Sequence, residues 1–414
     1  MNIAGKTKLF YGYVIVLACF CTTLAIFGTL YTFGVFFKPV LTEFGWTRAA
    51  ISGAFSLNMF LSGVLGIVAG RLTDKFGPRL VMTACGFFLG IGYLLMSQVT
   101  AIWQFYLFYG VIVGLGMSGS FAPLASTIAR WFVDRRGMMM GTVLAGVGFG
   151  AVIMPPVAGW LVSIYGWRTS YIIVGIVALV IITSAAQFLR RDPGQMEQLA
   201  FGAREVKAES LDLQHGGFSL QEATRTVQFG IVCAVLFCFG FITFAVMVHV
   251  VPHATDLGFS ATTAARIIAI IGGVSIVAKV IMGGAADRIG NKAAYIIGFA
   301  LSAATLFWLL AAREVWMLYL FAIIYSFGYS ALVVLEAPLV AELFGLSSLG
   351  VIIAVAGLGF TIGAAMGPLL AGYIFDITAS YQLAFLICAV VGIMGAVLTS
   401  FIRPVKRKGL IGHS

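Results

Sequence analysis

Long apolar stretches alternate with short polar turns along nearly the whole chain. A hydrocarbon core of roughly 30 Å needs about 20 apolar residues for one helical crossing. Stretches of that length, bounded by charged or turn residues, fall at 11–37, 48–70, 79–98, 102–129, 137–163, 167–189, 226–250, 262–286, 293–311, 315–341, 350–375 and 380–402. The pattern therefore predicts an all-α membrane fold with twelve transmembrane helices.

The twelve stretches form two similar sets, because one offset of 213 residues relates many positions in the first half to the second. The matched pairs include Pro39 and Pro252, Glu43 and Asp256, Gly45 and Gly258, Gly77 and Gly290, Gly146 and Gly359, Gly150 and Gly363, and Pro155 and Pro368. We therefore expect two pseudo-symmetric six-helix bundles, an N-terminal one at 1–189 and a C-terminal one at 226–414 with a short cytoplasmic tail. The polar stretch 190–225 is predicted to be a cytoplasmic linker loop with a short surface helix near 219–225.

Composition excludes a soluble domain. The chain is 61% hydrophobic and 10% charged, whereas soluble domains carry about 25% charged residues. The net charge of +10 comes from basic clusters in turns, which is typical of membrane topology and does not predict a nucleic-acid partner. All six cysteines lie in apolar stretches, where we expect small buried hydrophobic side chains.

The distribution of lysine and arginine predicts the orientation. With the N-terminus inside, 19 of the 25 basic residues lie on the cytoplasmic side and 5 on the other, and the one left over is Lys279. Because cytoplasmic loops are enriched in these residues, both termini are expected in the cytoplasm of a multi-pass cell (inner) membrane protein. The first apolar stretch lacks a small-residue cleavage site, which predicts a retained span and not a signal peptide.

Two polar segments carry the same motif. Residues 70–79 read GRLTDKFGPR and residues 283–292 read GGAADRIGNK, each after the second span of its half. Both resemble the G-x-x-x-D-[RK]-x-G-x-[RK] signature of the major facilitator superfamily, and the resemblance covers most of the chain. We expect a cytoplasmic gating motif in which the aspartate accepts hydrogen bonds from the start of the next helix. Its residues are Gly70, Asp74, Arg79, Gly283, Asp287 and Arg288.

Within the superfamily, residues 31–46, 131–137 and 345–368 resemble bacterial monocarboxylate transporters and the related oxalate:formate exchangers. Members typically carry an arginine in span eight that binds the substrate carboxylate, and Lys279 is aligned with it here. Animal members tend to carry an aspartate one turn earlier, where this chain has Ser275, and a lysine in span one, where it has Tyr31. The resemblance thus implies a carboxylate cargo held by Lys279 as a point charge.

Lys279 is the sharpest candidate for a binding residue. A lysine inside a span costs about 2.5–3.5 kcal/mol on insertion scales, so it calls for a partner, a wet cavity or a function. The alternative is that its side chain snorkels to the inner headgroups.

Glu336 is the other intramembrane charge, and Tyr325, Tyr329 and Glu336 share one helical face. One hypothesis is a Glu336–Lys279 pair with which a substrate anion competes, and the other is that Glu336 anchors the cytoplasmic end of its helix.

Three more polar residues have two interpretations each. His249 is a candidate for proton coupling and for sampling an entry vestibule, or it hydrogen-bonds headgroups and water. Tyr31 and Asn58 line the cavity by analogy, or they form interhelical hydrogen bonds of about 0.6 kcal/mol. The glycines and prolines of spans five and eleven are assigned to helix packing and bending.

Together these features predict a secondary active transporter that moves a small organic anion, such as lactate or pyruvate, with proton symport by alternating access. The substrate-binding candidates are Lys279, Tyr31, Asn58, Ser275, His249, Tyr325 and Tyr329, and the proton-coupling candidates are Lys279, Glu336 and His249. Carboxylate exchange and a non-transporting sensor on the same fold stay open as alternatives. No cofactor, metal or enzyme activity is predicted, and a monomer is the expected state.

Overall fold

The computed structural model describes residues 10–132, 136–196, 201, 218–345 and 349–403. The expected C-terminal tail, most of the linker at 190–225, and parts of the segments 131–137 and 345–368 lie outside these residues. The long helices are α1 (Gly12–Phe44), α2 (Arg48–Phe76), α3 (Pro78–Met96), α7 (Arg136–Phe188), α9 (Val227–Asp256), α10 (Ala261–Ile289), α11 (Asn291–Ala311), α12 (Val315–Phe344), α13 (Leu349–Thr378) and α14 (Gln382–Ser400).

Among the described residues, eleven helical stretches are long and apolar enough to cross a membrane. One of them, Met138–Phe188, lies within α7, which has 53 residues and contains a turn at Gly166, where φ is 74° and ψ is 167°. A straight helix of that length would measure about 80 Å, far more than a bilayer needs. The turn therefore separates two crossings, and the predicted all-α fold with twelve transmembrane helices is confirmed.

The fourth crossing is interrupted. It consists of α4 (Ile102–Phe105), the π-helix η1 (Tyr106–Val113), α5 (Gly114–Met117) and α6 (Ala122–Trp131). Residues 118–121 between α5 and α6 are not helical. Its counterpart at the 213-residue offset, α12, is continuous, so the two halves differ at this crossing.

Contacts group the chain into two compact units. The first consists of Met1–Phe36 and Leu61–Val206, and the second consists of Phe37–Phe60 and Lys207–Ser414. The second unit thus takes in the end of α1 and the first part of α2, which the sequence assigned to the N-terminal bundle. The short helix α8 (Leu220–Thr224) is present where the sequence placed a surface helix, and Ser219 and Glu222 form a capping box at its start.

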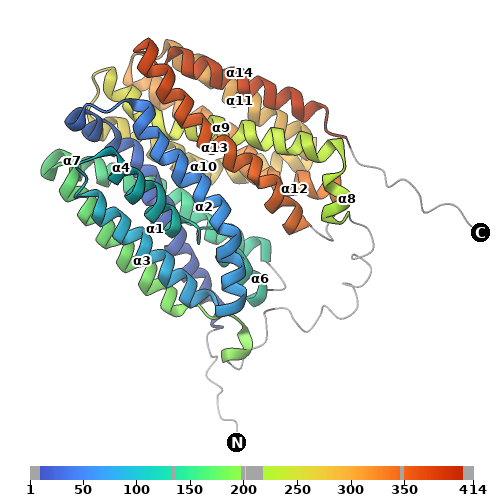
Figure 1. Cartoon of the computed structure of the whole chain (residues 1–414). Coiled ribbons are helices and arrows are strands. Elements are labelled where there is room, and N and C mark those ends of the chain that lie inside the picture. The colour runs from blue at the N-terminus through green and yellow to red at the C-terminus, as the bar shows by residue number, and fades with distance from the viewer. Residues whose placement is uncertain (1–9, 133–135, 197–200, 202–217, 346–348, 404–414) are drawn as a thin grey trace, which may run out of the picture. The chain divides into compact units, whose positions relative to one another are not determined.

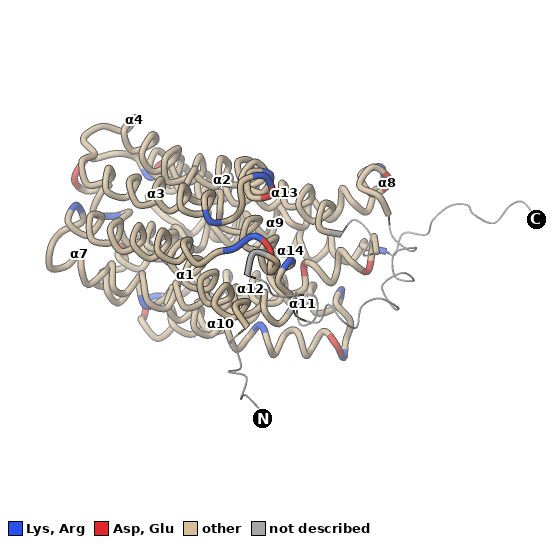
Figure 2. Tube along the Cα trace, turned by 90° about the horizontal axis from the view of Figure 1, so that it is seen from below, with Lys and Arg blue, Asp and Glu red and all other residues tan. Residues whose placement is uncertain are grey.

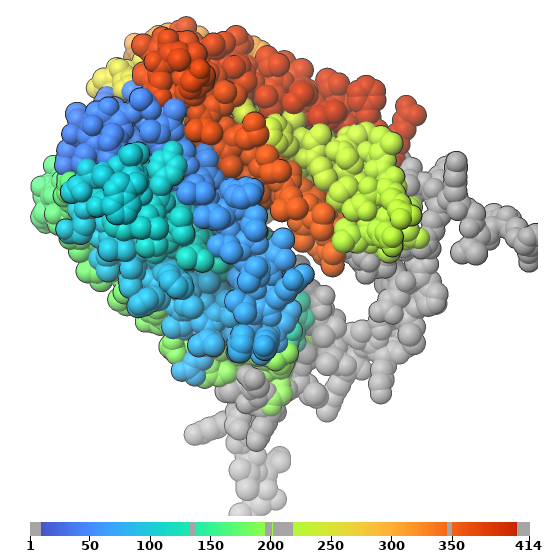
Figure 3. Space-filling view, viewed as in Figure 1, coloured from blue at the N-terminus to red at the C-terminus, as the bar shows by residue number. Residues whose placement is uncertain are grey.

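The 213-residue repeat reappears in the packing inside each unit. In the first unit, glycines of α7 press against backbone carbonyls of α1, and in the second, glycines of α13 press against carbonyls of α9. Figure 1 shows α13 running alongside α9, and the space-filling view in Figure 3 shows their surfaces in contact. The equivalent pairs are Gly146 with Phe20, Gly150 with Leu24, Gly359 with Cys233 and Gly363 with Phe237.

The turns repeat as well. A positive φ occurs at 64° in Gly45 and 95° in Gly258, at 85° in Gly77 and 88° in Gly290, and at 74° in Gly166 and 53° in Ala379. Each pair is separated by 213 residues, so the same turn recurs in both halves. Only the last pair places a residue other than glycine in this conformation.

Charged residues are sparse along the helices, and most of the tube in Figure 2 is tan. The described cysteines are all free thiols, and Cys19, Cys85, Cys238 and Cys388 are buried. These four are buried as the sequence predicts, whereas Cys21 and Cys233 are half-buried.

Candidate functional site

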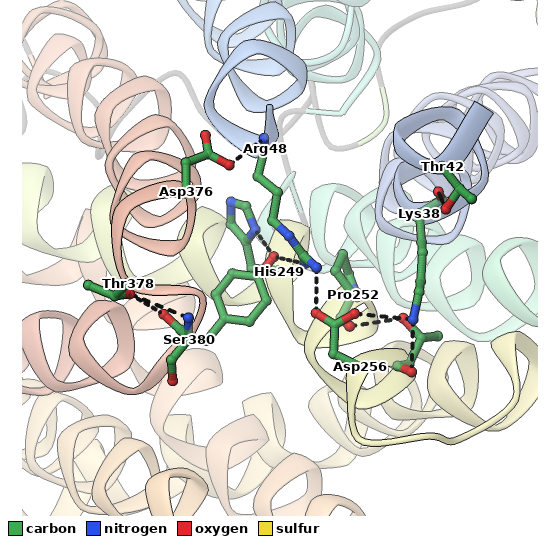
Figure 4. Close-up of polar contacts among 11 residues, drawn as sticks. Lys38, Thr42, Arg48, His249, Pro252, Asp256, Asp376, Thr378 and Ser380 are labelled. Atoms are coloured by element: carbon green, nitrogen blue, oxygen red, sulfur yellow. Dashed lines mark hydrogen bonds and ion pairs between the residues drawn. The ribbon is translucent and has the colours of Figure 1, made fainter. Parts of the chain in front are cut away.

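The most extensive group of polar contacts lies in the second unit. We call it the Arg48 cluster, and it consists of Lys38, Arg48, His249, Asp256, Asp376 and Tyr381. Its members come from the end of α1, the start of α2, the C-terminal half of α9, the end of α13, and the turn before α14. Figure 4 shows Arg48 between Asp376 and Asp256, with Lys38 reaching the same Asp256 carboxylate.

Asp376 closes the N-terminus of α2. Its two carboxylate oxygens accept hydrogen bonds from the backbone N–H groups of Arg48 and Ala49, both at 2.8 Å. The first N–H groups of a helix have no partner within the helix, and the helix dipole favours a negative charge there. A side chain 328 residues away thus caps this helix.

The Arg48 guanidinium is enclosed. Its Nη2 lies 2.6 Å from Asp256 Oδ2, its Nη1 donates to the Tyr381 hydroxyl at 2.6 Å, and its Cζ stacks 3.6 Å above the Phe375 ring. Lys38 Nζ lies 3.1 Å from the other oxygen of Asp256. Because the Arg48 side chain is only 9% exposed, water screens these contacts less than it would a surface ion pair.

His249 is fully buried inside this cluster. Its Nε2 lies 2.8 Å from the Pro368 carbonyl oxygen and 3.2 Å from Ser52 Oγ, and its Nδ1 lies 3.0 Å from the Tyr381 hydroxyl. Burial raises the pKa of Tyr381, so this phenol keeps its proton at neutral pH. The structure thus holds the fully buried His249 in a network of protein groups.

His253, one turn further along α9, is less engaged. It is buried against the rings of Tyr381 and Phe385, with ring centroids 5.8 and 5.2 Å away. Its Nε2 has no hydrogen-bond partner among the described residues. The two histidines therefore have different surroundings although they lie on the same helix.

Lys279 lies in the interior of α10, and its side chain is half-buried. The helix continues to Ile289, about 15 Å further along the axis. Ser275 and Met282 on the same helix are buried, whereas Val280 is 76% exposed. Lys279 therefore lies at the border of the buried face, and it forms no hydrogen bond or ion pair with any described residue.

Glu336 on α12 does not pair with Lys279 in the described structure, although α10 and α12 pack together. Among the described residues, it also forms no hydrogen bond with a helix end. Tyr295 on α11 is fully buried, and its hydroxyl has no hydrogen-bond partner in the same part of the chain. Neither contact that the sequence suggested for Glu336 is formed here.

Two other candidates on these helices lie within the packing of the second unit. Ser275 is buried, its hydroxyl donates to the Gly272 carbonyl, and its own carbonyl accepts from Ser330 of α12. Tyr325 is 1% exposed and stacks on Phe321. Tyr329 is half-buried, and its ring centroid lies 6.3 Å from that of Phe239.

Tyr31 and Asn58 fall in different units. Tyr31 is buried in the first unit with its ring near Phe27, and Asn58 is fully buried in the second. The other candidates of the second unit lie in three places: His249 in the Arg48 cluster, Asn58 on α2, and Lys279, Ser275, Tyr325, Tyr329 and Glu336 on α10 and α12.

The two copies of the gating motif differ. In the first unit, Asp74 accepts from Arg130 Nη2 of α6 at 2.7 Å, and Arg79 Nε donates to Gln187 of α7. The sequence predicted that Asp74 accepts hydrogen bonds from the start of the next helix. No such bond forms, because α3 begins after Gly77 with Pro78 and has no side-chain cap.

In the second unit, Asp287 and Arg288 form no hydrogen bond or ion pair with described residues. A Cβ added to Gly283 would meet nothing, whereas one at Gly70 would touch Ala122. Position 343, which corresponds to Arg130 at the 213-residue offset, is a leucine, so the second copy has lost its cationic partner.

Sequence reasoning missed the Arg48 cluster as a unit. In the sequence, Lys38, Arg48 and Asp376 are recognisable only as charges at the ends of apolar stretches, and Asp256 only as the repeat partner of Glu43. The available signal was the repeated acid at Glu43 and Asp256 close to the histidine pair of α9.

Comparison with known proteins agrees with this architecture. A family model described as Major Facilitator Superfamily matches residues 18–283 and 231–413. Monocarboxylate transporter 13 of Rattus norvegicus is 27% identical over 379 residues, which cover 91% of this chain and 85% of that relative. Monocarboxylate transporter 4 of Gallus gallus is 27% identical over 394 residues, which cover 92% of this chain and 80% of that relative.

Among solved structures, a bacterial homologue of the human lysosomal transporter Spinster, in an inward-facing and occupied conformation, superimposes with a TM-score of 0.76. It is 15% identical, and the match covers 96% of this chain and 97% of that one, so it supports the fold alone. With the family model matching nearly the whole chain and its relatives named as monocarboxylate transporters, this twelve-helix protein belongs to the major facilitator superfamily.

Proposed function

We propose that this protein is a secondary active transporter for a small monocarboxylate such as lactate or pyruvate, carried together with a proton by alternating access. The relatives that are 27% identical are named monocarboxylate transporters, and the matches cover most of their length. This similarity supports the substrate class. We further propose the orientation read from the basic residues, with both termini in the cytoplasm.

The observation that carries the proposal is the unpaired Lys279. A lysine within a span normally pairs with another group or faces a water-filled path, and Lys279 forms no polar contact with any described residue. It is therefore available to a carboxylate, which it would bind as a point charge without the two-pronged geometry of arginine.

The surrounding residues support Lys279 in different ways. We propose that half-buried Tyr329 contacts the cargo. Tyr31 and Asn58 are buried in this structure and stay candidates by analogy with the superfamily alone. Ser275 and Tyr325 act on the site by holding α10 against α12 and by filling the core, since both are buried.

Two groups are candidates for the transported proton. Lys279 would be neutral in the empty carrier and would gain a proton as the anion arrives, so that one proton enters with each carboxylate. Glu336 is the second, because it lies inside α12 without an ion pair to a described residue.

The test is uptake of labelled lactate by proteoliposomes with and without an inward proton gradient. We expect the gradient to accelerate uptake by the unaltered protein, and Lys279→Met to reduce it about 10- to 100-fold, the value of a charge-assisted contact. Arg266→Met is the matched control, because Arg266 is an exposed cation on the same helix without a polar contact to described residues.

Equal rates with and without the gradient would contradict proton symport, and a fully active Lys279→Met variant would contradict the assigned binding residue. Uptake only into vesicles preloaded with carboxylate would instead support exchange. The absence of any carboxylate movement would leave the sensor hypothesis.

A further inference from the structure

The Arg48 cluster contains an unbroken chain of polar contacts. It runs from Asp256 to the Arg48 guanidinium at 2.6 Å, from there to the Tyr381 hydroxyl at 2.6 Å, and from the hydroxyl to His249 Nδ1 at 3.0 Å. The other ring nitrogen, Nε2, reaches the Pro368 carbonyl at 2.8 Å. Through these contacts the start of α2 is joined to α9, to α13 and to the turn before α14.

The identity of these partners fixes where the protons are. A carbonyl oxygen can only accept, so His249 Nε2 carries the hydrogen that is donated to Pro368. Arg48 can only donate, so the Tyr381 oxygen accepts from it. The Tyr381 hydrogen is then free to be donated to Nδ1, which makes His249 the neutral Nε2–H form.

We propose that His249 is a proton-binding site that controls this chain, so that its protonation releases Tyr381 and Arg48 and frees the start of α2 from α9 and α13. The inference is independent of the cargo. In this proposal His249 controls the contacts of α2 with α9 and α13, and it does not bind the substrate.

Donor and acceptor counting supports the release. A proton on Nδ1 turns this nitrogen from acceptor to donor, and it would then point at a Tyr381 oxygen that already accepts from Arg48. Two cations would share one phenol oxygen, and the Tyr381 hydrogen would lose its acceptor. An unmet donor in a buried site is unfavourable, so the bonds on the two sides of Tyr381 compete.

In the part of the chain that the structure describes, both carboxylates of the Arg48 cluster already have polar partners. Facing His249 or its partners are Lys38 from α1, Arg48 from α2, Asp256 and His253 from α9, and Asp376 from α13, while Arg313 lies near His253. With neutral histidines, the two cations and two carboxylates of the Arg48 cluster cancel. Both carboxylates are already engaged, so a further proton gives the cluster a net positive charge.

Opening the chain would let water reach both ring nitrogens, which accommodates the imidazolium. The separated arrangement therefore binds the proton more tightly than the closed one, and acid shifts the population toward separation. On the proposed topology this end of the helices faces the outside, so external acid would act on it directly.

The test is a distance measurement by double electron–electron resonance on the full chain in detergent, without substrate. The six native cysteines are replaced by alanine, and spin labels are attached through Ala50→Cys at the start of α2 and Ile377→Cys near the end of α13, a half-buried and an exposed position of the second unit. We expect a longer-distance population that grows between pH 7.5 and pH 5.5, by about tenfold per pH unit at most for a single proton.

His249→Gln, which keeps a donor and an acceptor but cannot be protonated, should make this population independent of pH. Tyr381→Phe should also abolish the pH dependence, because it removes the link to Arg48. His253→Gln is the control. His253 packs edge-on against the Tyr381 ring but makes none of the hydrogen bonds or ion pairs of the chain, so this variant should keep the pH dependence of the unaltered protein.

A pH-independent population in the unaltered protein would overturn the proposal. So would a His249→Gln variant that keeps the original pH dependence, or a His253→Gln variant that loses it. If His249→Gln does not fold, Tyr381→Phe provides the same test. Loss of the pH dependence in this variant would support the proposal, and an unchanged pH dependence would contradict it. Failure of lactate uptake would count against the proposed function and not against this inference, because no substrate enters the measurement.

Discussion

At the scale of single residues, Arg48 shows how much of the site depends on the tertiary fold. Its backbone N–H binds Asp376 and its side chain binds Asp256 and Tyr381, with sequence separations of 328 and 333 residues to Asp376 and Tyr381. Periodicity and local motifs report on neighbours within a few turns of a helix. The sequence could therefore identify these residues as loop charges but could not pair them.

Lys279 is the opposite case, because a charge within an apolar stretch is visible without any structure. What the sequence could not determine is the rotation of each helix about its axis. Ser275 lies one turn before Lys279, yet it is buried against α12 while Lys279 is at the border. Membership of the same helix thus identified the candidates but did not tell which of them were accessible.

Ala379 allows a prediction about backbone strain. Its φ is 53°, in the turn that corresponds to Gly166 in the first half, and this conformation costs a non-glycine residue roughly 1–2 kcal/mol. Ala379→Gly should stabilise the protein by about 1 kcal/mol, since glycine adopts the conformation freely at some cost in entropy. The measurement is the apparent melting temperature of purified protein in detergent.

Gly166→Ala provides the mirror-image control. A Cβ at Gly166 would meet nothing within 4 Å, so only the backbone changes, and the melting temperature should fall. A higher melting temperature for Gly166→Ala, or a lower one for Ala379→Gly, would show that the backbone angle φ does not limit stability at these turns.

At the scale of elements, close glycine packing joins α1 to α7 in the first unit and α9 to α13 in the second. The glycines on α7 and α13 leave no space for a side chain, so the helix backbones touch. The sequence predicted this packing correctly because small residues recur every four positions. It did not reveal the partner helix, which required the fold.

Gly363→Ala tests this packing. The added methyl would meet backbone atoms of Phe237 and Phe241, which cannot rotate away, so we expect a loss of about 1–3 kcal/mol. The measurement is again thermal unfolding in detergent.

Gly357→Ala is the matched control on the same helix. A Cβ there meets nothing within 4 Å, and alanine favours a helix over glycine by about 0.5–1 kcal/mol. Its melting temperature should not fall. Equal losses at both positions would indicate that close approach of α9 and α13 is unimportant.

The interrupted fourth crossing was not predicted. Residues 102–129 read as one apolar stretch, and hydropathy does not distinguish a continuous helix from one with a break. In the structure, Gly119 in the break fits against Cys85 and Met82 of α3, where a Cβ would lie 2.8 Å and 3.0 Å from their sulfur atoms. The neighbouring Ser118, Ser120 and Pro123 were the local signals for a break.

At the scale of the whole molecule, the internal repeat was the most informative feature of the sequence. It predicted two six-helix halves, and the equivalent glycine contacts and turns reproduce the offset of 213 residues in three dimensions. The differences between halves were harder to see. Asp74 is paired with Arg130, but Asp287 has no such partner among the described residues, although the motif is present twice.

The proposed orientation has a direct test in intact cells with a membrane-impermeant maleimide. In a cysteine-free background, Thr42→Cys in α1 should be labelled from outside, whereas Gln221→Cys in α8 should be labelled only after permeabilisation. Both positions are exposed. The reverse pattern would invert the topology and place the Arg48 cluster at the cytoplasmic face.

The cap that Asp376 provides for α2 has a consequence for any attempt to divide the protein. A cut in the linker separates the amides of Arg48 and Ala49 from the carboxylate that binds them, together with the surface that buries residues 37–60. The first fragment alone would carry a frayed second helix and a bare guanidinium. We therefore expect the fragments to be obtained in folded form only when both are synthesised in the same cell, as complementary pieces of one structure.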